Sequence, residues 1–168
     1  AVARYLMRLD NNGRAAVTGL TMHSLSGASE DSLHPKREWL EGLDAVVYDI
    51  QDIGSRYYTY VWTLLHMMQA CAKAGVEVIV LDRPNPINGV DIEGGAIEEG
   101  YFRFVGRASI PNRHGLTARE VAQMCNDVFK LGCKLHVVTM DGWKREMDYD
   151  ATGLPWVQPS PNMPSGAS

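Results

Sequence analysis

Residues 45–81 read AVVYDIQDIGSRYYTYVWTLLHMMQACAKAGVEVIVL, and this stretch decides the fold. It opens with the apolar, β-branched run Ala45–Ile50, which predicts a strand buried on both faces. Residues 57–74 carry apolar side chains all round until near their end, so they predict a well-buried helix closed by Gly75. A second apolar run, Val76–Leu81, predicts another buried strand. A strand, a helix and a strand in so few residues indicate a βαβ unit with parallel strands.

The sequence on either side extends this pattern. Residues 83–100 form a long loop rich in Pro, Asn and Gly, and loops of that length in compact domains are usually functional or disordered. Residues 117–120 (TARE) are a capping-box sequence that opens a helix to about Lys130, and Leu135–Met140 predicts a third buried strand. Residues 15–25 predict a short strand. The whole pattern predicts a layered α/β domain with a mostly parallel sheet flanked by helices.

Composition excludes several classes of protein. The chain has 168 residues, a net charge of −4, 45% hydrophobic and 21% charged residues, which fits one globular domain and argues against disorder. The charge supplies no basic face of the kind that nucleic-acid binders carry. The longest uncharged apolar run, 57–72, falls short of a membrane span. No Cys-x-x-Cys occurs, so we expect Cys71 and Cys125 to be small core residues rather than metal ligands or redox groups.

Charged and amide side chains follow both strands of the βαβ unit. They are Asp49, Asp52 and Arg56 after the first strand, and Asp82, Arg83 and Asn85 after the second. In open parallel sheets ligands bind beyond the carboxyl ends of the strands, so we expect these groups to share one rim. Carboxyl groups held close in a partly dry cleft acquire different pKa values and can act as acid and base. The pattern favours carboxylate acid–base chemistry or ligand binding.

Two further candidates lie outside the strands. Glu93 is on the long loop and can reach the rim if that loop folds back, and Arg113-His114 immediately precedes the capped helix. No dinucleotide fingerprint, phosphate-binding loop or nucleophile elbow is present. Three simpler interpretations stay open. Asp49 and Asp52 can cap the following helix with Arg56 as their ion-pair partner, Asp82-Arg83-Pro84 can be a rigid turn, and Glu93 can be an ordinary surface glutamate.

Five segments resemble one known family in consistent order from about residue 40 to 164. They are Tyr48–Tyr60 (YDIQDIGSRYYTY), Leu81–Pro86 (LDRPNP), Ile92–Gly94 (IEG), His114–Thr117 (HGLT) and Pro159–Pro164 (PSPNMP). Together they resemble the NamZ family of exo-β-N-acetylmuramidases, glycoside hydrolase family 171. The resemblance implies a Rossmann-like catalytic domain followed by a smaller C-terminal domain. It also implies hydrolytic release of N-acetylmuramic acid from the non-reducing ends of peptidoglycan fragments.

The resemblance implies the following site. Asp49, Asp52, Asp82 and Glu93 form the pool of catalytic carboxyl groups, and Arg56, Arg83, Asn85, Arg113, His114 and Asn162 bind substrate. Glycoside hydrolysis needs two carboxyl groups. One of the three arginines can grip the lactyl carboxylate, and Tyr57, Tyr58 or Trp143 can stack on the sugar ring. No cofactor or metal is implied, the partner is a peptidoglycan-derived glycan, and the expected location is secreted or periplasmic.

The sequence also departs from the family. It lacks the upstream Pro-Glu-His-Gly motif, whose glutamate is implicated in catalysis, and stops before the second domain, so we expect 1–168 to be one truncated domain. An inactive sugar-binding module that keeps the cleft is therefore an alternative. A third hypothesis is a divalent-metal hydrolase that uses the same aspartates.

Overall fold

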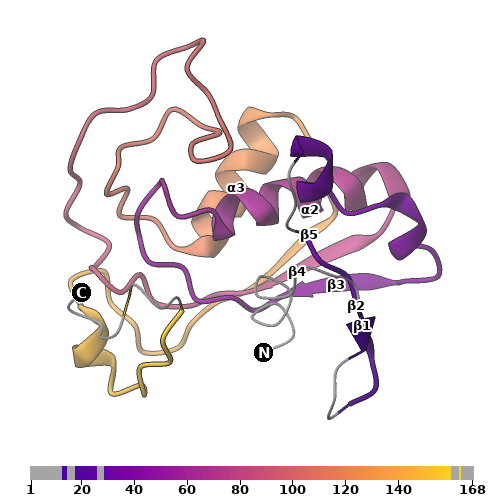
Figure 1. Ribbon diagram of the computed structural model, residues 1–168. Helices are drawn as coiled ribbons and strands as arrows, with labels where there is room; N and C mark the ends of the chain where they lie inside the picture. The colour runs from indigo at the N-terminus through magenta and orange to yellow at the C-terminus, as the bar shows by residue number, and fades with distance from the viewer. Residues whose placement is uncertain (1–12, 15–17, 26–28, 160–162, 164–168) are drawn as a thin grey trace.

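The computed structural model describes residues 13–14, 18–25, 29–159 and 163, and Figure 1 shows their arrangement. The strands are β1 (Gly13–Arg14), β2 (Thr21–Met22), β3 (Ala45–Tyr48), β4 (Glu77–Leu81) and β5 (Leu135–Val138). The α-helices are α2 (Tyr60–Ala74) and α3 (Ala118–Val128), and short 3₁₀ turns occupy Glu30–Leu33, Arg37–Trp39 and Tyr149–Thr152. Each predicted helix and strand of the βαβ unit is present, and no end differs from the prediction by more than three residues.

The main sheet has the order β3-β4-β5, and all neighbouring strands are parallel. Val78 in the central strand β4 lies opposite Val46 in β3 and Leu135 in β5. The layered α/β fold with a parallel sheet is therefore confirmed. The strand expected within residues 15–25 is present in part as β2, which pairs antiparallel with β1; residues 15–17 lie outside the described chain.

The core lies between this sheet and the two helices. Val78 and Val80 of β4 are fully buried against Leu64 and Met68 of α2 and Ala122 of α3. Cys71, Cys125 and Cys133 are free and buried, which confirms the prediction that Cys71 and Cys125 are core residues.

The prediction that the strands are buried on both faces is wrong for the described part of the chain. Both helices pack on the same face of the sheet, above it in Figure 1. Side chains that alternate onto the other face are left open: Val47 of β3 is 57% exposed and Val138 of β5 is 45% exposed. The apolar runs therefore predict the strands correctly but overestimate how far their side chains are buried.

The helices begin and end where local chemistry requires. Thr117 and Glu120 form both halves of the predicted capping box at the start of α3. Gly75 ends α2 in the left-handed conformation, with φ of 75°, and its N–H donates to the Cys71 carbonyl. Among the described residues no helix is long and apolar enough to cross a bilayer.

The carboxyl edge of the sheet is covered by irregular chain. The segment between β4 and α3 has no regular helix or strand, and the chain after β5 returns beside the same edge (Figure 1). These two segments, together with the one between β3 and α2, carry the sequence motifs and build the walls of the site.

Candidate active site

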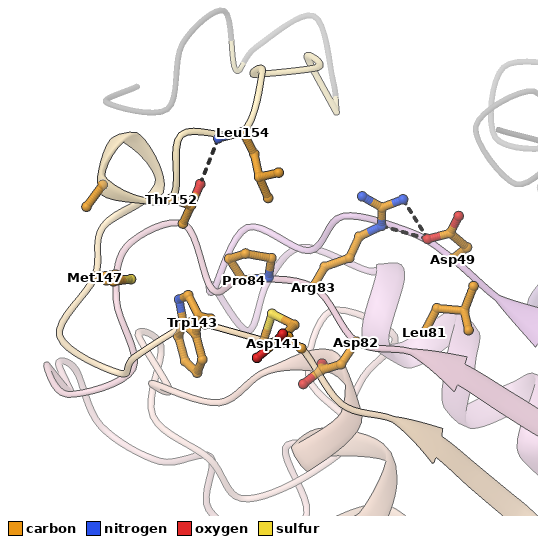
Figure 2. Close-up of a pocket in the computed structure, with 13 residues that line it drawn as sticks. Asp49, Leu81, Asp82, Arg83, Pro84, Asp141, Trp143, Met147, Thr152 and Leu154 are labelled. Atoms are coloured by element: carbon orange, nitrogen blue, oxygen red, sulfur yellow. Dashed lines mark hydrogen bonds and ion pairs between the residues drawn. The ribbon is translucent and has the colours of Figure 1, made fainter.

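A cavity of about 570 Å³ opens at the carboxyl ends of the three parallel strands. It is lined by Asp49 after β3, by residues 81–84 at the end of β4, and by residues 140–143 after β5; Met147, Ala151, Thr152 and Leu154 complete the wall. Figure 2 shows Asp49 and Arg83 on one side of this cavity and Trp143 and Met147 on the other. The cavity lies where the rule for open parallel sheets places a ligand.

Asp49 and Arg83 form an ion pair at the cavity wall. Arg83 Nε and Nη2 both donate to Asp49 Oδ1, at 2.7 and 2.6 Å, and both side chains are 39% exposed. Only one carboxylate oxygen is used in this pair. Within the described residues the other oxygen of Asp49 and the remaining guanidinium nitrogen of Arg83 have no hydrogen-bond partner and can take a ligand or water.

Asp82 lines the same cavity but directs its carboxylate elsewhere. Its Oδ1 accepts from the Arg119 backbone N–H at 3.1 Å, and its Oδ2 accepts from Thr117 Oγ1 at 3.0 Å and Arg119 Nε at 3.2 Å. The side chain is 1% exposed and points away from Arg83 in Figure 2. In this geometry Asp82 holds the start of α3, and the sequence-based alternative of a rigid turn describes only part of its role.

Asp52 lies in the interior beside His114 and not among the residues that line the cavity. Its Oδ2 accepts from the Gly54 N–H at 2.9 Å and lies 3.7 Å from His114 Nε2. Its Oδ1 is buried without a hydrogen-bond partner among the described residues. Burial raises the pKa of Asp52 to about 6, against the lowering effect of the Gly54 and Ile53 N–H groups.

The interpretation of Asp49 and Asp52 as caps of the following helix is wrong. The residue before α2 is Thr59, which makes no side-chain cap, and both aspartates are engaged elsewhere. Arg56 is not their ion-pair partner either. It donates instead to the carbonyl oxygens of Gly95 and Ile110, at 2.8 and 2.6 Å, and so holds the long loop in place.

Three sequence motifs meet around Gly54. Its N–H donates to Asp52, its carbonyl accepts from the His114 N–H at 3.4 Å, and its φ is 78°. A Cβ at this position would overlap Asn85 Oδ1, so only glycine fits. Asn85 is buried and donates to the Leu116 carbonyl at 3.0 Å. Asn85 thus ties the segment after β4 to the segment before α3.

Glu93 and Arg113 form a separate cluster on the long loop. Arg113 Nη1 donates to Glu93 Oε1 at 2.5 Å and Nη2 donates to Asp91 Oδ2 at 3.1 Å. Their backbones pair antiparallel, so the loop does fold back onto the segment before α3. The Glu93 side chain is 67% exposed and is not among the residues that line the cavity.

Asp141 is a cavity residue that the sequence reasoning overlooked. Asp141 lies three residues after the end of β5. The rule that ligands bind beyond the carboxyl ends of parallel strands, which identified the candidates after β3 and β4, therefore also identifies Asp141 when it is applied to β5. Trp143, proposed from the sequence to stack on a sugar ring, does line the cavity. Asn162 lies outside the described residues. Within the described ranges, no three or more His, Cys, Asp or Glu side chains are grouped so as to hold a metal ion.

Comparison with known proteins gives the same family as the motifs. The sequence model described as "Exo-beta-N-acetylmuramidase NamZ, N-terminal" matches residues 7–167. The "Peptidoglycan beta-N-acetylmuramidase NamZ" of Bacillus subtilis (strain 168) is 45% identical over 148 residues, which cover 88% of this chain and 35% of that relative.

Two crystal structures of DUF1343 family proteins from Bacteroides fragilis share the fold. One has a TM-score of 0.86 and 47% identity and covers 92% of this chain; the other has a TM-score of 0.72 and 31% identity and covers 81%. This chain spans 40% and 37% of those two chains, so it is similar to about a third to two-fifths of each relative. Since the family model matches nearly the whole sequence, the chain belongs to the NamZ family and corresponds to its N-terminal domain.

Proposed function

We propose that this chain supplies the strand-edge part of the catalytic site of an exo-β-N-acetylmuramidase that removes N-acetylmuramic acid from peptidoglycan fragments. The observation that carries the proposal is a pair of carboxyl groups three residues apart in unlike environments. Asp52 is buried with a raised pKa of about 6, and Asp49 is half-exposed in an ion pair at the cavity. The name of the 45%-identical Bacillus subtilis relative supports the same activity.

The two environments suit the two roles that glycoside hydrolysis requires. A carboxyl group with a pKa of about 6 keeps its proton in mildly acidic solution and can act as the general acid. Because Asp52 does not line the cavity of the chain alone, this role requires it to come within hydrogen-bond reach of the glycosidic oxygen, to which it donates the proton as the bond from that oxygen to the sugar C1 breaks. Asp49 acts as the carboxylate on the other side of C1. Water supplies the hydroxyl that ends on C1, and its proton returns to Asp52.

Arg83 is the arginine best placed to hold the lactyl carboxylate that distinguishes N-acetylmuramic acid from N-acetylglucosamine. It lines the cavity with a free nitrogen, whereas Arg56 is bound to carbonyl groups and Arg113 to Glu93 and Asp91. A guanidinium can bind a carboxylate with two parallel hydrogen bonds. The Trp143 ring offers an apolar surface for the sugar.

The other site residues predicted from the sequence have supporting or untested roles in this proposal. Glu93 and Asn162 remain candidates for contact with the substrate, and Asn85 and Asp82 support the loops that bear the site. A peptidoglycan-derived substrate favours a secreted or periplasmic location, which stays a prediction.

The general-acid role of Asp52 can be tested with two substrates that differ in leaving group. The assay compares Asp52→Asn and Asp49→Asn in a chimera that joins this chain to the rest of the Bacillus subtilis relative. Loss of a general acid costs about 10²–10⁴-fold in turnover when the leaving sugar needs protonation. We expect Asp52→Asn to show that loss on an N-acetylmuramyl disaccharide and a much smaller loss on the 4-nitrophenyl glycoside, whose leaving group needs no acid. Asp49→Asn is expected to impair both substrates.

Asp44→Asn is the matched control, because Asp44 is exposed at the opposite end of β3. Equal losses on both substrates in Asp52→Asn would show that Asp52 is not the acid. Tight binding of N-acetylmuramic acid without any release by the unmutated chimera would instead identify a binding module.

A further inference from the structure

The ring of His114 and the carboxyl group of Asp52 face each other in the interior. The Nε2–Oδ2 distance is 3.7 Å, and the two side chains are 0% and 8% exposed. The segments that carry them are joined by backbone contacts, since His114 N–H donates to the Gly54 carbonyl and Ser55 pairs with Arg113. The pair is thus built by two loops that are more than fifty residues apart in sequence.

The contacts of His114 determine which ring nitrogen carries the proton. The Leu116 backbone N–H donates to His114 Nδ1 at 3.0 Å, so Nδ1 presents a lone pair. A neutral imidazole has one acceptor and one donor nitrogen, which leaves the hydrogen on Nε2. Burial, together with the Arg56 charge, lowers the pKa of His114 to about 4, despite the opposing charge of Glu120, so the ring is neutral near pH 6.

The Nε2–H group has no other acceptor among the described residues, and Asp52 Oδ2 is the carboxylate oxygen that it faces. At 3.7 Å this contact is too long for a hydrogen bond, but a movement of under ~1 Å would form one. Oδ2 already accepts from Gly54 N–H, whereas Oδ1 is unpartnered among the residues described. Two N–H donors therefore point at Oδ2, and Oδ1 is the oxygen left to carry the proton of the neutral carboxyl group.

We infer that His114 is a positioning residue for Asp52: its neutral Nε2–H faces and fixes Oδ2, so that the acidic proton of Asp52 resides on Oδ1. The inference rests on the proposed catalytic role of Asp52. It replaces the expectation that His114 binds substrate directly, because a ring that is fully buried, with Nδ1 already occupied, reaches the substrate only through Asp52.

The other groups around the pair do not replace this contact. Burial, with the nearby charges of Asp52 and Tyr60, raises the pKa of Tyr48. Tyr60 donates to the Pro159 carbonyl. Arg56 and Glu120 affect His114 only by their charge. Replacing His114 thus removes the side-chain N–H that, among the described residues, lies within 4 Å of the Asp52 carboxyl group.

The first test is the tautomer of His114 in the unmodified chain, measured by ¹⁵N NMR of the imidazole. We expect hydrogen on Nε2 and a bare Nδ1 from about pH 5 to 8. Hydrogen on Nδ1, or a charged ring at pH 6, would overturn the inference. This measurement needs no variant that could fail to fold.

The second test follows the Asp52 carboxyl by ¹³C NMR in His114→Ala and His114→Gln. Loss of the donor in His114→Ala should raise the pKa of Asp52 by on the order of one unit, because the charged form loses a hydrogen-bonding group. His114→Gln keeps an N–H donor and should return the pKa toward that of the unmodified chain. His136→Ala, at an exposed histidine of β5, is the control and should leave it unchanged.

An Asp52 pKa that is unchanged in both His114 variants, or shifted equally by Ala and Gln, would show that His114 only fills space. If His114→Ala does not fold, the tautomer of His114 measured in the unmodified chain decides. Neither measurement depends on turnover. A chimera in which Asp52→Asn keeps full activity would refute the proposed function while leaving these spectra as they are.

Discussion

Arg83 both pairs with Asp49 and is placed to distinguish between substrates. It neutralises Asp49 through a single carboxylate oxygen and keeps part of its guanidinium at the cavity. The other two arginines considered for the substrate are occupied by carbonyl groups or by loop carboxylates. We therefore expect Arg83 alone of the three arginines to bind the lactyl carboxylate of the substrate.

Arg83→Met should reduce kcat/KM of the chimera for an N-acetylmuramide about 10–100-fold more than for the matching N-acetylglucosaminide, since a hydrogen bond to a charged group contributes about 1.5–3 kcal/mol. Loss of the Asp49 partner affects both sugars, so the ratio between them is the quantity to measure. Arg103→Met is a suitable control, because Arg103 lies between β4 and α3, is not among the residues that line the cavity, and donates to the adjacent Phe102 carbonyl. An unchanged ratio would remove Arg83 as the selecting group.

At the scale of elements, the start of α3 is fastened to the end of β4. Asp82 accepts three hydrogen bonds from Thr117 and Arg119, in addition to the capping box of Thr117 and Glu120. Arg145 reaches Glu120 from the chain after β5, with Nη1 donating to Oε1 at 2.6 Å. The helix end, the strand end and the cavity wall are thus one connected unit.

Asp82→Asn should lower the free energy of unfolding by about 2–4 kcal/mol, because the amide replaces one of the two acceptor oxygens with a donor and removes the negative charge that pairs with Arg119. Urea unfolding followed by circular dichroism measures this loss. Asp127→Asn, an exposed change in the last turn of α3, should alter stability by less than about 0.5 kcal/mol. If Asp82→Asn abolishes turnover of the chimera without any loss of stability, Asp82 is a catalytic carboxylate after all.

At the scale of the whole molecule, buried titratable groups couple folding to pH. Burial lowers the pKa of His66 and of His114 to about 4. The Nδ1 atoms of His66 and His34 lie 2.9 Å apart, so the two rings share one hydrogen between these nitrogens. Burial raises the pKa of Asp52 to about 6. The histidines exclude protons that the unfolded chain binds, whereas Asp52 retains one that the unfolded chain releases.

The free energy of unfolding should therefore fall as the pH drops from about 6.5 to 4. Over this range the unfolded chain gains protons on two histidines, and the opposite effect of Asp52 cancels less than half of it; the net loss is about 3 kcal/mol. Urea midpoints measured across that pH range test this. Asp52→Asn should steepen the fall, because it removes the compensating group. A midpoint that is constant or rises on acidification would contradict the assignment of these buried groups.

Much of the fold follows from local pattern. The βαβ unit, the Gly75 stop and the capping box at Thr117 are found where the sequence predicts them, because strand preference, helix capping and left-handed glycine are decided by residues within a few positions of each other. The same reasoning brought Asp49, Asp82 and Arg83 to one edge of the sheet.

Local sequence patterns could not predict which side chains pair with one another in the site. Asp49 meets Arg83, Asp82 meets Arg119, and Asp52 meets His114 across 34, 37 and 62 residues of sequence, and the composition of each segment allows other pairings. The placement of Asp52 away from the cavity is a further example.

The sequence by itself determined the elements, their parallel order along the chain and the polar residues at their ends. Only the tertiary structure decided that both helices cover the same face of the sheet, and which carboxyl group is sealed, paired or buried with a raised pKa. The physical reason is the distance along the chain over which each interaction acts. Backbone preferences act over one or two turns of chain, whereas desolvation and ion pairing depend on side chains that long loops bring together only when the whole domain packs.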